Sequence, residues 1–142
     1  MILDSINYWG VLAAVVVNMA VGALWYSKLL FGPAWMKSVG LTEDDIKDGN
    51  KAMVFAGVLS VLIAFFMAVV LQWVGPPDHG GSGLGLGLIV GFAMWLGFSG
   101  PTLFIHLIFH QGTGKQYLIN GGNYLVAQTL MGGVLGAIQW GM

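Results

Sequence analysis

The sequence predicts an all-α fold, specifically an integral membrane four-helix bundle, from two observations. Of its 142 residues, 57% are hydrophobic and 8% are charged, whereas about a quarter of the residues in a soluble domain are usually charged. Four apolar stretches are also long enough to cross a bilayer, since a spanning helix needs about 20 residues. Because these stretches use most of the length, we expect one four-span domain, residues 1–142, and no soluble part.

The first span is predicted at about residues 6–28 and is interpreted as an uncleaved anchor. Tyr8 and Trp9 lie near its start and Trp25 and Tyr26 near its end, as is typical where aromatic rings settle at the two membrane interfaces. No basic segment precedes the stretch and no small-residue cleavage site follows it, which argues against a signal peptide. The remaining spans are predicted at about residues 52–74, 84–110 and 117–140.

A short interfacial helix is predicted between the first and second spans. Thr42 has the form of an N-cap, acidic residues 43–45 follow it in the first turn, and Gly49-Asn50 would end the helix. We interpret its charges as a solvated face. In the next connection, residues 75–83, turn-forming residues predominate and His79 is expected to be exposed.

All five lysines lie at the same ends of the predicted spans. Lys28, Lys37, Lys47 and Lys51 belong to the first connection, Lys115 belongs to the turn before the last span, and the chain has no arginine. By the positive-inside rule, these ends and the interfacial helix face the cytoplasm. We therefore predict a multi-pass protein of the plasma (inner) membrane with both termini on the non-cytoplasmic side.

Small and polar residues form a stripe on each predicted span. Helices in lipid associate through such residues, so the stripes indicate buried faces. In the last span the polar residues and most glycines lie on different sides of the helix, which predicts a polar face inside the bundle and a glycine face against a neighbouring helix. In one hypothesis that helix belongs to a second copy, which gives a homo-oligomer with a dimer favoured. The stripes of the first three spans comprise Ala14, Asn18 and Gly22; Gly57, Ser60, Ala64, Ala68 and Gln72; and Gly83, Gly87 and Gly91 followed by the polar part Trp95, Ser99, Thr102, His106 and His110. The last span has Asn120, Asn123, Tyr124 and Gln128 on one side and Gly121, Gly122, Gly132, Gly133 and Gly136 mostly on the other.

Pro101, preceded by Gly97 and Gly100, lies inside the third span. Proline has no N–H to donate to the carbonyl of Gly97, so a kink with a free acceptor is expected. Two interpretations stay open. The break is either a packing kink whose carbonyl is satisfied by Ser99 or Thr102, or an unwound point in a solute site.

The candidate ligand-binding site is a polar vestibule that opens at the lysine-bearing ends of the third and fourth spans. Polar groups inside a membrane are costly and usually face the bundle interior, which makes them functional candidates. These candidates are Asn18, Trp95, Thr102, His106, His110, Asn120, Asn123, Tyr124 and Gln128.

His106 and His110 lie four residues apart on one helix face, and three interpretations of the pair are open. They are interfacial side chains bonded to amides or water, or a proton-responsive gate or solute contact, because histidine titrates near neutrality. Metal or haem binding is the least favoured, since no carboxylate lies within a span to complete a metal site.

No enzyme class is favoured by the sequence. It contains no paired carboxylates in a span and no nucleophile with a base at a recognisable spacing. The glycine-rich residues 81–87 lack the preceding strand of a dinucleotide site. The absence of cysteine excludes thiolate sites, so we expect no metal and no cofactor. A net charge of −1 without arginine argues against a nucleic-acid partner.

Two segments resemble a known family. Residues 7–36, with Leu24-Trp25-Tyr26-Ser27, and residues 118–126, with Ile119-Asn120-Gly121, are similar to small bacterial membrane proteins catalogued as domain of unknown function 1761. With the span layout, the resemblance covers nearly the whole chain. It implies a four-span membrane protein of no established activity and supplies no catalytic residues. The chain departs from the family pattern at Lys28, where a proline is expected, and in the turn 110–114.

Three functions are compatible with the sequence, in a protein surrounded by membrane lipid. The first is binding or passage of a small solute through an inward-facing polar cavity between spans one, three and four. The second is a scaffold or accessory subunit that docks other membrane helices through its glycine faces. The third is a lipid or quinone pocket. A water-accessible cavity lined by Thr102, His106, Asn120 and Asn123 would favour the first, and a dry bundle with a flat glycine face the second.

Overall fold

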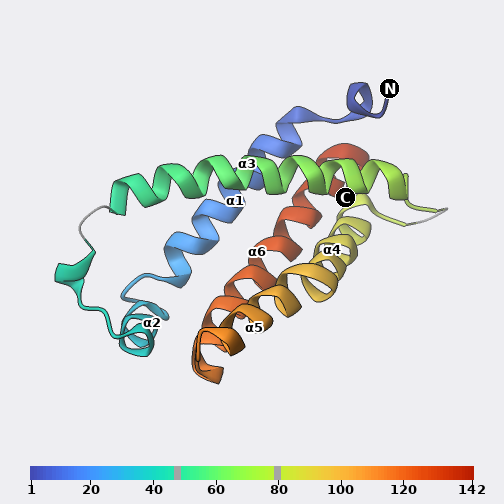
Figure 1. Cartoon of the computed structure of the whole chain (residues 1–142). Coiled ribbons are helices and arrows are strands. Elements are labelled where there is room, and N and C mark those ends of the chain that lie inside the picture. The colour runs from blue at the N-terminus through green and yellow to red at the C-terminus, as the bar shows by residue number, and fades with distance from the viewer. Residues whose placement is uncertain (47–48, 79–80) are drawn as a thin grey trace.

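The computed structural model describes residues 1–46, 49–78 and 81–142, and within them it is helical without strands. The all-α class is therefore confirmed, and each predicted span agrees with a helix to within three residues at either end. The predictions for Lys47 and His79 lie outside the described residues. The elements in Figure 1 are η1 (Ile2–Ser5), α1 (Tyr8–Trp25), α2 (Gly32–Val39), η2 (Glu43–Asp45), α3 (Gly49–Val74), α4 (Gly83–Met94), the π-helical turn η3 (Trp95–Ser99), α5 (Gly100–Phe109) and α6 (Gly114–Trp140).

Polar residues begin the long helices where their side chains can bond free backbone N–H groups. Asn7 accepts from the N–H of Trp9 at the start of α1, and Ser82 accepts from that of Gly85 at the start of α4. Thr113 and Gln116 form a reciprocal capping box at the start of α6. These local contacts stabilise the starts of α1, α4 and α6.

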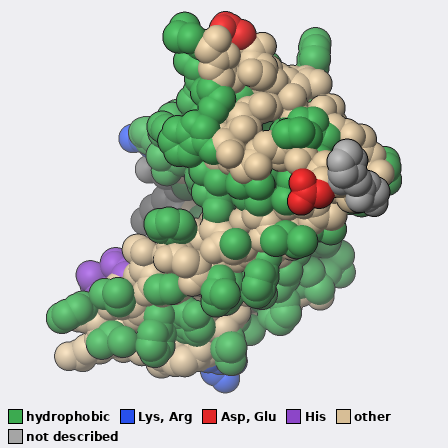
Figure 2. Space-filling model, turned by 90° about the vertical axis from the view of Figure 1, so that its right-hand side faces the viewer, with side chains coloured by type: hydrophobic (Ala, Val, Ile, Leu, Met, Phe, Trp, Pro, Cys, Tyr) green, Lys and Arg blue, Asp and Glu red, His purple; other side chains and the backbone are tan. Residues whose placement is uncertain are grey.

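Three helical runs are long and apolar enough to cross a membrane: α1, α3 and the continuous run Gly83–Phe109, which joins α4, η3 and α5. Apolar side chains accordingly cover much of the surface, and acidic and basic side chains appear only at isolated points (Figure 2). α6 has 27 residues but is less apolar and is not among the three. Its polar and small residues contact other helices of the same chain, because α6 is the central helix of the fold.

Glycines bring α4 and α6 into backbone contact along one side of α6. A methyl group on Gly87 would overlap the carbonyl group of Gly132, and one on Gly136 would overlap that of Gly83. Only glycine permits this approach, which is the packing expected of small residues spaced by four. The glycine face of α6 is thus filled by α4 of the same chain, and a dimer would need another surface.

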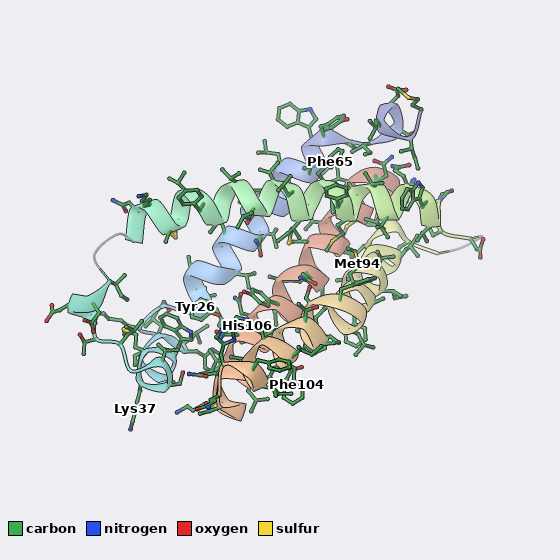
Figure 3. The ribbon with its side chains drawn as sticks, in the orientation of Figure 1. Tyr26, Lys37, Phe65, Met94, Phe104 and His106 are labelled. Atoms are coloured by element: carbon green, nitrogen blue, oxygen red, sulfur yellow. The ribbon has the colours of Figure 1, made fainter. Side chains whose placement is uncertain are left out.

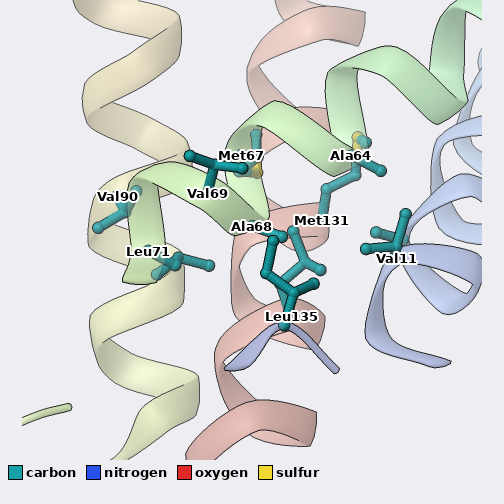
Figure 4. Packing of buried hydrophobic residues seen from close by; sticks show 11 residues of the cluster. Val11, Ala64, Met67, Ala68, Val69, Leu71, Val90, Met131 and Leu135 are labelled. Carbon is teal, nitrogen blue, oxygen red and sulfur yellow. The ribbon is translucent and has the colours of Figure 1, made fainter. Parts of the chain in front are cut away.

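α3 crosses the other long helices instead of running alongside them (Figure 1). Its second half carries the predicted stripe into the core, where Met67 and Leu71 meet Met131 and Leu135 of α6 (Figure 4). Its first half, up to Leu59, has no buried residue. α3 therefore holds the bundle at one end and overhangs it at the other.

The helix between the first two spans lies earlier than predicted. Thr42 does form a capping box with Asp45, but the element it starts is a single 3₁₀ turn, and Gly49 begins α3 instead of ending a short helix. The helix in this connection is α2, which has a proline in its first turn and ends at Gly40 with φ of 72°. Proline at the start and left-handed glycine at the end are both helix-boundary signals.

Candidate functional site

A groove lies between α1, α3, α5 and α6, and its larger part has a volume of about 500 Å³. We call this part the polar compartment, because six of the nine residues around it are polar. It extends from the middle of the long helices to His106 in the last turn of α5. Its polar lining is Asn18, Ser99, Thr102, His106, Tyr124 and Gln128, and its apolar lining is Ile63, Phe98 and Leu103.

A second hollow of about 320 Å³ adjoins the first beneath α3. We call it the apolar compartment. Four residues, Ile63, Phe98, Ser99 and Gln128, line both hollows, so the two form one continuous groove. The residues that line only the second are Leu62, Phe66, Met67 and Met94. Polar residues are more frequent in the lining towards the end of α5 than towards α4.

Two hydrogen-bonded pairs hold the helices around the groove. The amide nitrogen of Gln128 in α6 donates to the hydroxyl of Ser99 in η3 over 2.6 Å. The amide nitrogen of Asn18 in α1 donates to the hydroxyl of Ser60 in α3, also over 2.6 Å, and Ser60 in turn donates to the carbonyl of Ala56. These side chains therefore use hydrogen-bonding groups in contacts between helices.

Thr102, His106 and Tyr124 also line the polar compartment, but their side chains make no hydrogen bonds between the described helices. The hydroxyl groups of Thr102 and Tyr124 and the ring of His106 have no hydrogen-bond partner among the described residues. A hydroxyl both donates and accepts, and a neutral imidazole does the same through its two nitrogens. The compartment therefore offers three free hydrogen-bonding groups, from two helices, to a molecule inside it.

The π-helical turn η3 places two groove residues, Phe98 and Ser99. It occupies the stretch just before Pro101, where the proline removes one α-helical hydrogen bond, and the N–H of Gly100 instead bonds to the carbonyl of Trp95, five residues back. Such turns occur frequently at functional sites. After this turn, α5 packs on α6 less extensively than α4 does, which leaves room for the polar compartment.

Of the two histidines, only His106 lines the groove. The rings of His106 and His110 stack with centroids 4.0 Å apart, and Nδ1 of His110 lies 2.9 Å from the backbone carbonyl oxygen of His106. His106 extends from α5 on the side of Tyr26, whereas Phe104 lies on the other side of the helix (Figure 3). Within the described residues, no three His, Asp or Glu side chains come together.

Three further predicted residues lie outside the groove lining. The indole N–H of Trp95 donates to the carbonyl of Gly121 over 3.0 Å, and Asn120 accepts a 2.8 Å bond from the hydroxyl of Tyr26. Asn123 is 5% exposed, and its amide nitrogen has no partner among the described residues. Asn18, Thr102, His106, Tyr124 and Gln128 do come together around the polar compartment.

Three lining residues, Ser99, Phe98 and Ile63, are not among the predicted ligand-binding residues. Ser99 belongs to the polar stripe of the third span, and Thr102 and His106 continue that stripe along the same helix face, so its position carried a usable signal. Ile63 reaches the groove only because α3 crosses over it. Nothing in the local pattern of α3 indicates that crossing.

The two segments that carry the family resemblance meet in space. The indole N–H of Trp25 donates to the carbonyl of Ile119 over 2.8 Å, and the next residue, Tyr26, bonds to Asn120. A methyl group on Gly122 would lie 2.9 Å from the Trp25 ring. Trp25 and Trp95 thus bond to backbone carbonyls two residues apart in α6, and Gly122 leaves space for the indole of Trp25.

Charged groups near the groove lie beyond the ends of the long helices. Lys28 and Glu43 form an exposed ion pair of 2.8 Å. Hydrogen bonds from the hydroxyl and the backbone N–H of Thr42, of 2.7 and 2.8 Å, lower the pKa of the Asp45 carboxyl. These pairs organise the connection from α1 to α3 and do not line the groove.

Comparison with protein families yields a match over most of the chain. The model described as Protein of unknown function (DUF1761) matches residues 9–136. No curated protein and no solved structure matches. The resemblance seen in the two sequence segments is therefore confirmed.

Proposed function

The chain belongs to the DUF1761 family, whose function is unknown, and from its geometry we propose a small integral membrane protein that binds a small molecule in the groove. The observation that carries the proposal is the polar compartment, about 500 Å³ in volume. Ligand sites are typically hollows of about 300–1,000 Å³ with a few convergent polar groups. Thr102, His106 and Tyr124 are the groups proposed to contact the ligand.

The proposed topology has four spans. α1, α3 and the run from α4 to α5 have the required length and apolarity, and α6 has the required length. Its polar side chains are compatible with a bilayer because the other helices surround it. The lysine-bearing ends would face the cytoplasm and both termini the opposite side of the inner membrane. The polar compartment, which reaches the last turn of α5, would then open inward.

The scaffold alternative has less support. It requires glycine faces that are free to dock other helices, but the glycine stripes of α4 and α6 are in contact with each other. The solute hypothesis expected a cavity lined by Thr102, His106, Asn120 and Asn123. The first two line it, and the other two are replaced by Tyr124 and Gln128 from the same helix.

Cysteine accessibility tests the proposal in a chain that has no cysteine of its own. Thr102→Cys places a thiol in the polar compartment, and Phe104→Cys places one on the other side of α5. We expect a membrane-impermeant, positively charged methanethiosulfonate to modify the first variant about tenfold faster or more, because only a thiol that water reaches ionises readily. The measurement is the rate of modification in inside-out membrane vesicles.

Lys115→Cys controls for orientation, since it should react in inside-out and not in right-side-out vesicles. Reaction at position 102 in inside-out vesicles alone supports an inward-opening site. Equal protection of positions 102 and 104, with position 115 fully reactive, would contradict the proposal.

A further inference from the structure

We propose that the ligand of the groove is a neutral amphiphile with a hydroxyl- or carbonyl-bearing head and one apolar chain, which enters from the bilayer. This inference rests on the function proposed above and names the class of molecule that the groove would hold. The polar and apolar compartments share Ile63, Phe98, Ser99 and Gln128. One molecule can therefore place its head in the first and its chain in the second.

The head is expected to be neutral because no charged partner lines the groove. Neither compartment has Lys, Asp or Glu in its lining. A phosphate or carboxylate is usually bound by Arg or Lys, and a charge without such a partner is expensive to bury. A hydroxyl or carbonyl oxygen needs only hydrogen bonds, which Thr102, His106 and Tyr124 can supply.

The chain is expected to enter sideways because the rim of the apolar compartment is exposed. Leu62, Phe66 and Phe98 are 51%, 60% and 70% exposed, whereas Met67 is completely buried. All of them lie well inside predicted spans, so in the proposed topology the exposed ones face lipid. A molecule already dissolved in the bilayer can reach this compartment without crossing water.

Selectivity would come from the head. Lipid tails are as apolar as the side chains of the apolar compartment, so a chain gains little free energy by moving from the bilayer into the groove. A polar head that leaves the interface must have its lost hydrogen bonds replaced. The free groups of Thr102, His106 and Tyr124 can replace them, which favours molecules that combine both parts.

Photolabelling in lipid nanodiscs tests the inference with two probes that differ only in the head. One is a monoacylglycerol and the other a fatty acid, and both carry the same diazirine in the chain. We expect the monoacylglycerol to label Phe66, Met94 and Phe98 of the full-length protein. The fatty acid, kept ionised by irradiation at pH 9, should label them weakly. Peptide mass spectrometry after irradiation locates the labelled residues.

The double variant Thr102→Val with Tyr124→Phe removes two head partners and nearly keeps their shape. Because both hydrogen bonds to the head are lost, labelling by the monoacylglycerol should fall about tenfold. Thr129→Val is the matched control, since Thr129 is outside the groove lining and its hydroxyl is buried without a partner among the described residues. It should label as the unaltered protein does.

Two results would overturn the inference. One is equal labelling of the groove by both probes, and the other is labelling spread evenly over the exposed first half of α3. Either result with position 102 still accessible to the charged reagent would leave the proposed function intact and point to a ligand from water. If position 102 is protected as well, the proposed function fails too.

Discussion

Two stretches of α6 show how one helix serves two purposes. Where α6 meets α4, glycines at positions 132 and 136 let the two backbones touch. Nearer its start, where α6 faces η3 and α5, Tyr124 and Gln128 line a groove. The contact with α4 leaves no space for a methyl group, whereas the groove leaves space for a ligand. The difference teaches that small residues close this fold and larger polar residues keep part of it open.

The tightly packed contact with α4 gives the largest expected effect on stability. Gly87→Ala places a methyl group on the carbonyl of Gly132, whose carbon would lie 2.7 Å away. The helices must separate, and overpacking of this kind costs about 1–3 kcal/mol. Unfolding by sodium dodecyl sulfate in dodecyl maltoside micelles, followed by circular dichroism, measures the change.

Gly57→Ala is the matched control, because nothing lies within 4 Å of its added methyl group. Alanine is the better helix former by up to about 1 kcal/mol, so this variant should be as stable as the unaltered protein or more so. Equal effects of the two substitutions would show that the α4 contact does not decide stability.

Substitution of two buried amide residues of α6 is expected to have a smaller effect on stability. The comparison distinguishes Gln128, which lines the groove, from Asn123, which does not. Gln128→Leu removes the bond to Ser99, and an interhelical hydrogen bond in a membrane contributes about 0.6 kcal/mol on average and up to about 1.7. Asn123→Leu removes an amide nitrogen that has no partner in the described part of the chain, so it should be neutral or stabilising. The same detergent titration compares them, and a larger loss for Asn123→Leu would contradict the assignment.

The smallest effect is expected in a segment away from both the glycine contact and the groove. Hydrogen bonds from Thr42 lower the pKa of Asp45 below its ordinary value of 3.8. The ionised carboxylate therefore stabilises the folded turn above that value, and the stabilisation is lost as pH falls through the lowered pKa. Hydrogen exchange of residues 42–46 should rise on acidification beyond its intrinsic pH dependence. Asp45→Asn should remove this excess, while exchange in α6 stays unchanged in both proteins.

The sequence predicts the helices well because their signals are local. Apolar length places the long helices, and the spacing of Gly83, Gly87 and Gly91 identifies a face that is indeed buried. The boundary residues Pro33 and Gly40 also carried a local signal for α2, which the acidic residues after Thr42 outweighed in the prediction.

The site could be predicted only in part, because its lining depends on how the helices are rotated and crossed. Asn120, Asn123 and Tyr124 share one side of α6 in the sequence pattern. Glycine packing and the two indole contacts fix the rotation of α6, so that only Tyr124 of these three lines the groove. The crossing of α3, which brings Ile63 to the groove, arises from contacts between distant segments.

The position of α6 in the chain has a consequence for biosynthesis. The central helix is made after the helices that pack on it, since each of them precedes α6 in the chain. Chains are synthesised from the N-terminus, so α1, α3 and α4 leave the ribosome before their shared partner exists. Until then the glycine stripe of α4 and the hydroxyl of Ser99 lack their contacts. These contacts can form only once α6 has been made, and a chain truncated before α6 would present these surfaces to the membrane insertion and quality-control machinery.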